Sequence, residues 1–294
     1  ASVVKIEHPN GGDHGRYIGP GFDEFGALFA ACNRNKRSLA LDLRTPEGVA
    51  IVHRLAAEAD VVIENFRAGV ADRMGIGYEA LSRLKPDLIY LSITGFGPDG
   101  PYAGQRAYDS VIQSLSGLAD SQSAPGGQPA LVSSIICDKA TALTAAQAVA
   151  AALFARERGE GGRRIDVSLL DASLAFNWPD VMWNHTLLGD GFAPGPTLSE
   201  TYRLWRTQDG HIAIVFIAED AFRGWARALS AGPEIESETF ADLKAQRARW
   251  EELVPLWESR LAALTTEEAL ARLHAQSVPA GRVRPRAELM DDPQ

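Results

Sequence analysis

Apolar residues recur in short runs through the first half of the chain, and segments with a helical pattern separate these runs. Strands are predicted at residues 3–6, 39–43, 61–64, 88–93 and 164–167. A helix is predicted to begin at Thr45-Pro46-Glu47, with Thr45 as N-cap and Pro46 at the first helical position. Strands that alternate with helices are typical of parallel βαβ units. The first half is therefore predicted to be an α/β domain built on a doubly wound parallel sheet.

The pattern changes where Gly and Pro residues cluster, near residues 189–196. Two alternating runs, 202–207 and 211–215, flank Gln208-Asp209-Gly210, and Asp-Gly between such runs predicts a β-hairpin. Helical patterns then dominate from Ala218 to about Ala275, after a helix predicted at residues 169–188. We therefore expect a large α/β domain at residues 1–189 and a smaller α+β domain at residues 190–275.

One carboxylate lies between two predicted elements of the first half. The apolar run Leu131–Cys137 predicts a strand, and an Ala-rich helix is predicted from Ala140 to about Phe154. Asp138 lies at this junction, where α/β proteins place their chemistry, at the carboxyl end of a sheet and the positive end of a helix dipole. Aspartates that only cap a helix favour the same position. Asp138 is therefore a candidate both for catalysis and for capping.

Composition narrows the classes of function. The chain has 294 residues, 46% of them hydrophobic, and a net charge of −9, so it lacks the basic character of nucleic-acid-binding proteins. No stretch of about 18 apolar residues and no signal-peptide pattern occurs. The two cysteines, Cys32 and Cys137, lack the spacing of a metal site. We expect a cytoplasmic protein with no bound metal, no membrane association and no nucleic-acid partner.

Three polar segments follow or precede predicted strands and are candidates for ligand binding. Residues 64–74 combine Phe66 and Met74 with two arginines, which suits a nucleotide clamp but also an ordinary surface loop. Residues 33–38 carry further cations. The glycine-rich segment 93–102 permits close backbone approach to a ligand, yet matches neither a Walker loop nor Gly-x-Gly-x-x-Gly. An ATP-dependent or nicotinamide-dependent enzyme is therefore disfavoured.

Several motifs occur in the order typical of one known family. The motifs are Lys5-Ile6-Glu7-His8-Pro9, Gly12-Asp13, Asn33-Arg34-Asn35-Lys36-Arg37-Ser38, Glu64-Asn65-Phe66-Arg67, Gly95-Phe96-Gly97, Tyr108-Asp109-x-x-Ile112-Gln113-x-x-Ser116-Gly117, Asp138-Lys139 and Val167-Ser168-Leu169-Leu170-Asp171. With them the sequence resembles, over almost its whole length, the family III CoA-transferases. This family, also called CaiB/BaiF, includes formyl-CoA transferases and α-methylacyl-CoA racemases.

The resemblance implies a Rossmann-like large domain, the smaller α+β domain, and a final segment, residues 276–294, that returns to the large domain. It also implies an interlocked homodimer, in which two chains thread through each other. Members of the family begin with an additional strand and an active-site loop before the position equivalent to Ser2. We therefore expect the full protein to be longer than these residues.

By this resemblance, Asp138 falls on the catalytic aspartate of the family. Its carboxylate is expected to attack an acyl-CoA thioester, giving a mixed anhydride and then an aspartyl-CoA thioester, from which a carboxylic acid retrieves CoA. Backbone N–H groups at the start of the next helix are expected to hold the oxyanions. Coenzyme A and acyl-CoA are then substrates, and no tightly bound cofactor is expected.

The resemblance also assigns residues to CoA binding. Phe66 and Met74 are expected near the adenine, Arg73 near phosphate, and Arg106 at a cationic CoA contact. The full set of expected CoA-binding residues is Leu41, Asn65, Phe66, Arg73, Met74 and Arg106.

Two alternatives to CoA transfer stay open. In the racemases a His-Asp pair occupies the position of Tyr108-Asp109, and a phenol is a weaker general base than imidazole at neutral pH, so racemisation is disfavoured. The glycine-repeat lid of formyl-CoA transferases is not evident near residues 189–197. The second alternative is a CoA-binding protein without turnover. The sequence does not identify the acyl donor or the acceptor acid.

Overall fold

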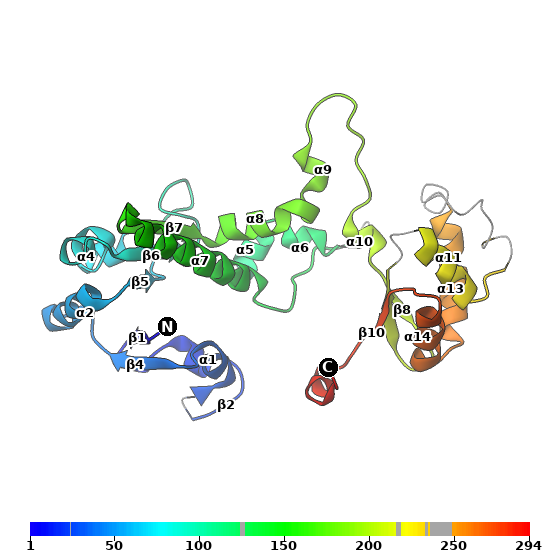
Figure 1. Cartoon of the computed structure of the whole chain (residues 1–294), viewed down its shortest axis with the longest axis horizontal. Coiled ribbons are helices and arrows are strands. Elements are labelled where there is room, and N and C mark those ends of the chain that lie inside the picture. The colour runs from blue at the N-terminus through cyan, green and yellow to red at the C-terminus, as the bar shows by residue number, and fades with distance from the viewer. Residues whose placement is uncertain (24, 124–126, 216–218, 233–234, 236–248) are drawn as a thin grey trace. The chain divides into compact units, whose positions relative to one another are not determined.

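The computed structural model of the chain describes residues 1–23, 25–123, 127–215, 219–232, 235 and 249–294. It divides the chain into two compact units, Ala1–Gly195 and Pro196–Gln294. Each unit has its own strands and helices (Figure 1). A helical region was predicted from Ala218 to about Ala275. Within it, residues 218, 233–234 and 236–248 lie outside the described residues.

Unit 1 contains two parallel sheets. β1 (Val3–Glu7) pairs with β4 (Lys36–Ala40), and β6 (Ile89–Thr94) lies between β5 (Val61–Glu64) and β7 (Arg163–Ser168). A short antiparallel pair, β2 (Gly21–Phe22) and β3 (Phe25–Gly26), precedes α1 (Ala27–Cys32). The predicted strands at 3–6, 61–64, 88–93 and 164–167 are confirmed. The fold is a mixed α/β fold with parallel sheets.

Helices cover both faces of the β5-β6-β7 sheet. Successive strand residues point to opposite faces. Tyr90 packs with Ala56 and Leu81 from α2 (Pro46–Glu58) and α4 (Tyr78–Leu84). The next residue, Leu91, packs with Ala145 and Ala172 from α7 (Ile136–Ala155) and α8 (Leu169–Val181), and α7 lies beside the strands in Figure 1. The central strand β6 is therefore buried between helices, whereas the outer strands β5 and β7 keep exposed residues.

The start of α2 confirms its prediction in detail. Thr45 is the N-cap, its Oγ1 accepts a hydrogen bond from the Gly48 N–H at 3.1 Å, and Pro46 follows at the first helical position. The remaining helical segments of this unit are η1 (His14–Tyr17), α3 (Val70–Arg73), α5 (Asp109–Leu115), α6 (Leu118–Ser121), η2 (Arg156–Glu160) and α9 (Trp183–Thr186). The helix predicted at 169–188 is shorter, because it contains Pro179 and ends at Val181.

The second predicted strand is misplaced by three residues. It was expected at 39–43, whereas β4 spans Lys36–Ala40 and places Lys36 opposite Val3 and Ala40 opposite Glu7. Polar residues enter the strand because Ser38 donates a hydrogen bond, 2.7 Å long, to the carboxylate of Glu7. Leu41 leaves the strand and packs elsewhere.

The run Leu131–Cys137, expected as a strand, forms none, and α7 begins within it at Ile136. Asp138 therefore lies in the first turn of a helix. It does not lie at a strand-to-helix junction, and it is not the N-cap, which is Ile135.

Glu7, at the end of β1, anchors the loop that follows. Arg16 donates two hydrogen bonds to its carboxylate, at 2.8 and 2.9 Å, and the backbone N–H of Asp13 donates a third at 3.0 Å. These donors, Arg16 first, lower the pKa of Glu7 from its usual 4.5 to about 2, against the effect of burial. The ionised carboxylate is thus stabilised by folding.

We predict that Glu7→Gln lowers the free energy of unfolding by about 3 kcal/mol at pH 7. Because the folded-state pKa is lowered, the contribution of Glu7 is present above pH 4.5 and disappears as the pH falls toward 2. Urea unfolding of wild type and variant at several pH values measures the difference. The exposed Glu79, changed to Gln, is the control. An equal difference at pH 7 and pH 3 would contradict this account.

Unit 2 combines an antiparallel sheet with helices. Its strands, β8 (Leu204–Arg206), β9 (His211–Ile214) and β10 (Ala280–Arg282), lie in the order β10-β9-β8. The predicted hairpin around Asp209-Gly210 is confirmed by the pairing of β8 with β9. The described helical segments are α10 (Leu198–Thr201), α11 (Glu219–Ala228), α13 (Trp250–Ala262), α14 (Thr266–Ala275) and η4 (Arg286–Asp291).

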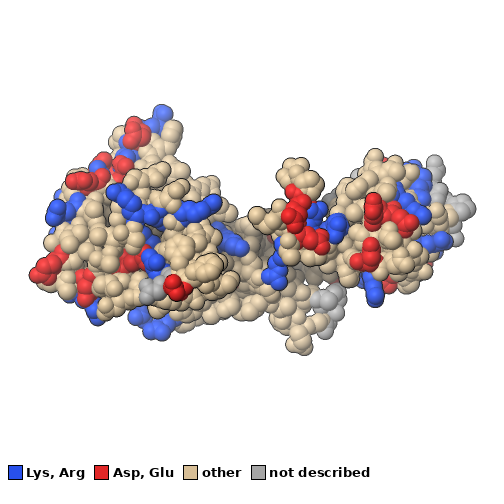
Figure 2. Space-filling view, turned by 90° about the horizontal axis from the view of Figure 1, so that it is seen from below, with Lys and Arg blue, Asp and Glu red and all other residues tan. Residues whose placement is uncertain are grey.

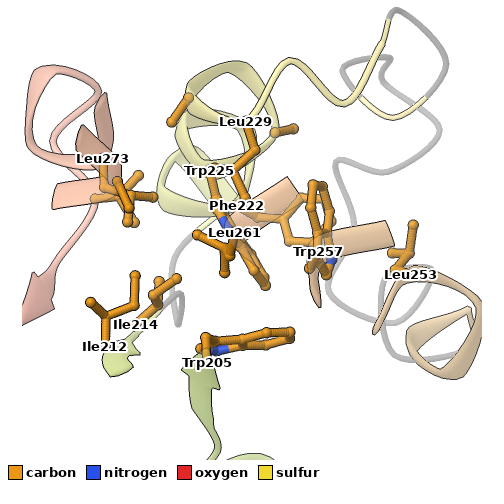
Figure 3. Close-up of a cluster of buried hydrophobic side chains, with 14 of the residues drawn as sticks. Trp205, Ile212, Ile214, Phe222, Trp225, Leu229, Leu253, Trp257, Leu261 and Leu273 are labelled. Atoms are coloured by element: carbon orange, nitrogen blue, oxygen red, sulfur yellow. The ribbon is translucent and has the colours of Figure 1, made fainter. Parts of the chain in front are cut away.

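Aromatic side chains form the core of unit 2. Trp225 and Trp257 are stacked with ring centroids 4.5 Å apart, and Phe222 meets both rings edge-on. Figure 3 shows these rings above Trp205 and the strand residues Ile212 and Ile214. The core is self-contained within this unit. The predicted division into residues 1–189, 190–275 and 276–294 stays a prediction.

Candidate active site

The segment before α7 is bonded to itself in a way that excludes a strand. The N–H of Ser134 donates to the carbonyl of Val132 at 2.7 Å, and the N–H of Ile136 donates to the carbonyl of Ser134 at 2.8 Å. Bonds between residues two apart are those of γ-turns, and they bend the chain at each step. Apolar composition alone predicted the strand, and these turns override it.

α7 is capped by a side chain from another helix. Its N-cap, Ile135, has no side chain that can accept a hydrogen bond. The Asp109 carboxylate instead reaches across from α5, and its Oδ1 accepts from the N–H groups of Cys137, at 2.8 Å, and Asp138, at 3.1 Å. Asp109 is 8% exposed. A buried carboxylate thus satisfies two N–H groups at the positive end of the α7 dipole.

The other N–H groups of the first turn are also occupied. Ile136 donates to Ser134, and Lys139 donates to the carbonyl of Ile135 at 3.2 Å. The expectation that N–H groups at the start of this helix hold an oxyanion is therefore not supported.

Asp138 presents an unengaged carboxylate. The residue is exposed, and within the described part of the chain its carboxylate accepts no hydrogen bond and forms no ion pair. Loss of solvent around the carboxyl raises its pKa, and the neighbouring Asp109 carboxylate raises it further. A carboxylate without donors is available as a nucleophile.

The start of α7 lies near the carboxyl ends of β6 and β7. Cys137 packs with Ile112, from α5, and Leu169, the first residue of α8 after β7. Gly95, just past β6, accepts a hydrogen bond from the N–H of Leu170 at 3.1 Å. A Cβ on Gly95 would lie 2.5 Å from the Cβ of Ala107, so only glycine allows this approach. The glycine-rich loop thus joins the starts of α5 and α8.

Three of the expected CoA-binding residues lie in one apolar cluster. Leu41, Phe66 and Met74 are partly buried and pack around a core that includes Val52 and Ile76. Segments after β4 and β5 and the end of α3 supply them. The structure therefore brings these side chains together, as a site for a planar ring requires.

Asn65 links this cluster to the glycine-rich loop. Its side-chain amide donates to the carbonyl of Ile93, near the end of β6, at 2.7 Å. Arg73 and Arg106 are exposed, and neither forms an ion pair within the described residues. Arg106 lies three residues before Asp109, between the glycine-rich loop and α5. Figure 2 shows Lys and Arg side chains mixed with Asp and Glu on this unit. Attraction of an anionic ligand therefore depends on individual arginines and not on the net charge of the chain.

The sequence did not reveal the capping by Asp109 or the role of Gln113 beside it. Their spacing of four residues places both on one helix face, and the Gln113 amide donates to Asp109 at 2.6 Å. That pairing was visible in the Tyr108-Asp109-x-x-Ile112-Gln113 motif. The motif did not reveal that Asp109 accepts a hydrogen bond from the N–H of Cys137, 28 residues further along the chain.

Two absences concern the described residues alone. None of their helices is long and apolar enough to cross a membrane. They also contain no cluster of three or more His, Cys, Asp or Glu side chains that suits a metal ion.

Comparison with known proteins agrees with this α/β fold. The chain belongs to CoA-transferase family III, whose profile matches residues 1–294, and it is therefore the chain of an enzyme of the CoA-transferase class. The family prediction is confirmed.

Individual relatives share about a third of the sequence. The chain is 36% identical to a succinate–glutarate CoA-transferase of Agrobacterium fabrum, over all of this chain and 76% of that protein. It is 33% identical to an acetyl-CoA:oxalate CoA-transferase of Acetobacter aceti, with the same coverage of 100% and 76%. A crystal structure of a CaiB/BaiF family protein from Brucella suis superposes with a TM-score of 0.85, at 35% identity, over 100% of this chain and 79% of that one.

Proposed function

We propose that this enzyme moves CoA from an acyl-CoA donor to a carboxylic acid acceptor, with Asp138 as the nucleophile. The observation that carries the proposal is the unengaged Asp138 carboxylate, fixed in the first turn of α7 by the Asp109 cap. Covalent catalysis needs a nucleophile that is held in place and free to react. Membership of the CoA-transferase family supports the same role.

The reaction is a series of acyl exchanges. An oxygen of Asp138 attacks the thioester carbonyl, the C–S bond breaks, and a mixed anhydride and the CoA thiolate form. The thiolate attacks the aspartyl carbonyl, releases the donor acid as a carboxylate, and leaves an aspartyl-CoA thioester. The acceptor carboxylate then displaces CoA to form a second anhydride, and the thiolate attacks its acyl carbon. The product acyl-CoA leaves and the Asp138 carboxylate is restored.

We propose short dicarboxylic acids as the substrates. Relatives carry the names succinate–glutarate CoA-transferase and acetyl-CoA:oxalate CoA-transferase, and a mouse relative, 31% identical, is a succinyl-CoA:glutarate CoA-transferase. Succinyl or glutaryl thioesters as donors, with a second dicarboxylate as acceptor, are therefore the first pairs to assay.

The test is trapping of the intermediate. The enzyme is incubated with glutaryl-CoA, then treated with hydroxylamine, and its peptides are mapped by mass spectrometry. A hydroxamate at Asp138, together with succinyl-CoA formed when succinate is added, is the expected result. CoA binding without any adduct or transfer would instead establish a CoA-binding protein without turnover.

The surroundings of Asp109 favour transfer over racemisation. Its carboxylate already accepts hydrogen bonds from Cys137, Asp138 and Gln113, so it is occupied as a structural acceptor. Tyr108 is 71% exposed. Exchange of the substrate α-proton for deuterium, without exchange of CoA between acids, would favour the racemase instead.

We propose that the Leu41, Phe66 and Met74 cluster contacts the adenine of CoA, with Asn65, Arg73 and Arg106 as polar contacts. Arg73 follows Ala71, a member of the cluster core, on the short helix α3 and is exposed without an ion pair among the described residues, which suits a phosphate.

We predict that Arg73→Ala raises the Kd for CoA by about 10-fold, while kcat at saturation changes less than about 2-fold. The reason is that a phosphate contact is lost at a distance from the reacting carboxylate. Calorimetric titration with CoA measures the affinity. Arg83→Ala is the matched control, because Arg83 is likewise exposed in the last turn of a helix. Equal affinities for the two variants would remove Arg73 from the site.

The remaining architecture is proposed from the family. The two parallel sheets of unit 1 are proposed to belong to one doubly wound, Rossmann-like sheet, within a large domain at residues 1–189 to which residues 276–294 return. The active form is proposed to be an interlocked homodimer in the cytoplasm, without a tightly bound cofactor and without membrane or nucleic-acid partners. Sedimentation analysis of the purified enzyme tests the dimer.

A further inference from the structure

We propose that Gln113 is a positioning residue for Asp138, and that one amide fixes both the Asp109 cap and the backbone leading into α7. The inference rests on the proposed function of Asp138. It concerns how this carboxylate is held for reaction and assigns Gln113 no contact with substrate.

The contacts of Gln113 engage both hydrogens of its amide and its carbonyl oxygen. The residue is 2% exposed. Its Nε2 lies 2.6 Å from Asp109 Oδ2, 3.2 Å from the carbonyl oxygen of Val132 and 3.1 Å from that of Ser134. Its Oε1 accepts from the Val132 N–H at 2.9 Å. One amide hydrogen thus serves Asp109 and the other is shared by two carbonyls, so no donor is left over.

These contacts act on Asp138 from two directions. Through Asp109, Gln113 fixes a carboxylate whose other oxygen accepts from the N–H of Asp138 itself. Through Val132 and Ser134, it fixes the two γ-turns that lead into the helix. Lys139 holds the same turns from outside, where its Nζ donates to Ser134 Oγ at 2.8 Å. Hydrogen bonds therefore hold both the segment that precedes α7 and the backbone N–H of Asp138 within its first turn.

These contacts require a side-chain amide on a chain as long as that of glutamine. Asp109 and the two carbonyls need a donor, and the Val132 N–H needs an acceptor at the same end of the side chain. Glutamate in its ionised form supplies no donor and places a second carboxylate against Asp109. Methionine fills a similar volume but offers neither donor nor acceptor. Asparagine is one methylene shorter.

Loss of this lock is expected to change the rate of reaction more than the binding of CoA. A displacement of about 1 Å at a reacting group lowers a rate by up to about 100-fold. We expect Gln113→Met to slow acylation of Asp138 by about 10- to 100-fold. The KM for glutaryl-CoA is expected to change less than about 2-fold, because the proposed CoA contacts lie in a separate cluster.

Rapid-quench measurement of glutarate release from glutaryl-CoA, without acceptor, separates positioning from stability, because one glutarate is freed as each site forms its aspartyl-CoA thioester. The burst amplitude counts functional sites and the rate constant reports reaction at each site. Wild type, Gln113→Met and Gln147→Met are compared, the last as a control because Gln147 is exposed on α7. A smaller rate constant in Gln113→Met alone supports positioning. A reduced amplitude with an unchanged rate constant would overturn it in favour of a structural role, and no burst in wild type would refute the proposed function itself.

A charge-exchanged pair tests the same coupling even where Gln113→Met folds poorly. Gln113→Glu places two carboxylates together, whereas the double variant Asp109→Asn/Gln113→Glu restores one donor and one acceptor with reversed polarity. The double variant is expected to acylate at least about 5-fold faster than Gln113→Glu alone. A double variant no faster than the single one would show that the two side chains are not coupled.

Discussion

Replacing Asp138 with Ala is expected to lower kcat for CoA transfer by at least about 10,000-fold. The variant removes the only group proposed to form a bond with the substrate, so both the anhydride and the aspartyl-CoA thioester become impossible. Its carboxylate takes no part in capping α7, because Asp109 satisfies the N–H groups there, so the helix is expected to remain intact. Steady-state assays with glutaryl-CoA and succinate measure the loss.

The control for this variant is Asp120→Ala. Asp120 is also an exposed aspartate in the first turn of a helix, α6, and is expected to change kcat by less than about 2-fold. CoA affinity is expected to be the same in both variants, since the Phe66 and Met74 cluster is untouched. Transfer activity that survives in Asp138→Ala would assign the nucleophile to another residue.

Replacing Asp109 with Ala is expected to produce the second largest effect, on stability and activity together. The N–H groups of Cys137 and Asp138 lose their acceptor in a buried setting, which costs about 2–4 kcal/mol of unfolding free energy. The first turn of α7 also loosens, and we expect kcat to fall by about 100-fold. Chemical unfolding and steady-state kinetics measure the two effects.

Asp109→Asn removes the charge of the cap, and because its amide nitrogen then faces the Gln113 donor, the pH profile rather than the rate is the informative readout. Its amide oxygen still accepts from the helix, but the negative charge that raises the pKa of Asp138 is gone. Asp138 reacts as an anion, so activity rises with pH through its pKa. The acid limb of the kcat/KM profile is therefore expected to move to lower pH in the variant. It should move only partly, because the partial loss of solvent around the carboxyl is the larger cause of the raised pKa. An unmoved or upward-shifted acid limb would show that Asp109 does not tune the nucleophile.

Local patterns predicted the elements whose determinants are local. The start of α2 follows from Thr45 and Pro46, the hairpin follows from Asp209-Gly210, and the buried β6 follows from its continuous apolar run. In each case the residues that decide the structure lie within the element or beside it. The same reasoning ranked Asp138 as a helix-start carboxylate, although it could not separate a cap from a nucleophile.

The wrong predictions of secondary structure and capping arose where side chains far away in the sequence determine the local backbone. Residues 131–137 have the composition of a strand, yet their carbonyls and N–H groups are held by Gln113, nearly 20 residues earlier. β4 is displaced because Ser38 pairs with Glu7 on the neighbouring strand. The cap of α7 comes from Asp109, on another helix. None of these partners is visible in a local window of sequence.

The raised pKa of Asp138 also bears on the thermodynamics of the proposed transfer. An acyl group is less strongly activated when its leaving carboxylate is more basic, by up to about 1.4 kcal/mol for each pKa unit. The Asp109 charge and the partial loss of solvent around Asp138 therefore bring the anhydride closer in free energy to the thioesters that precede and follow it in the reaction. The proposed anhydride is thus lower in free energy than one formed on an aspartate with an ordinary pKa.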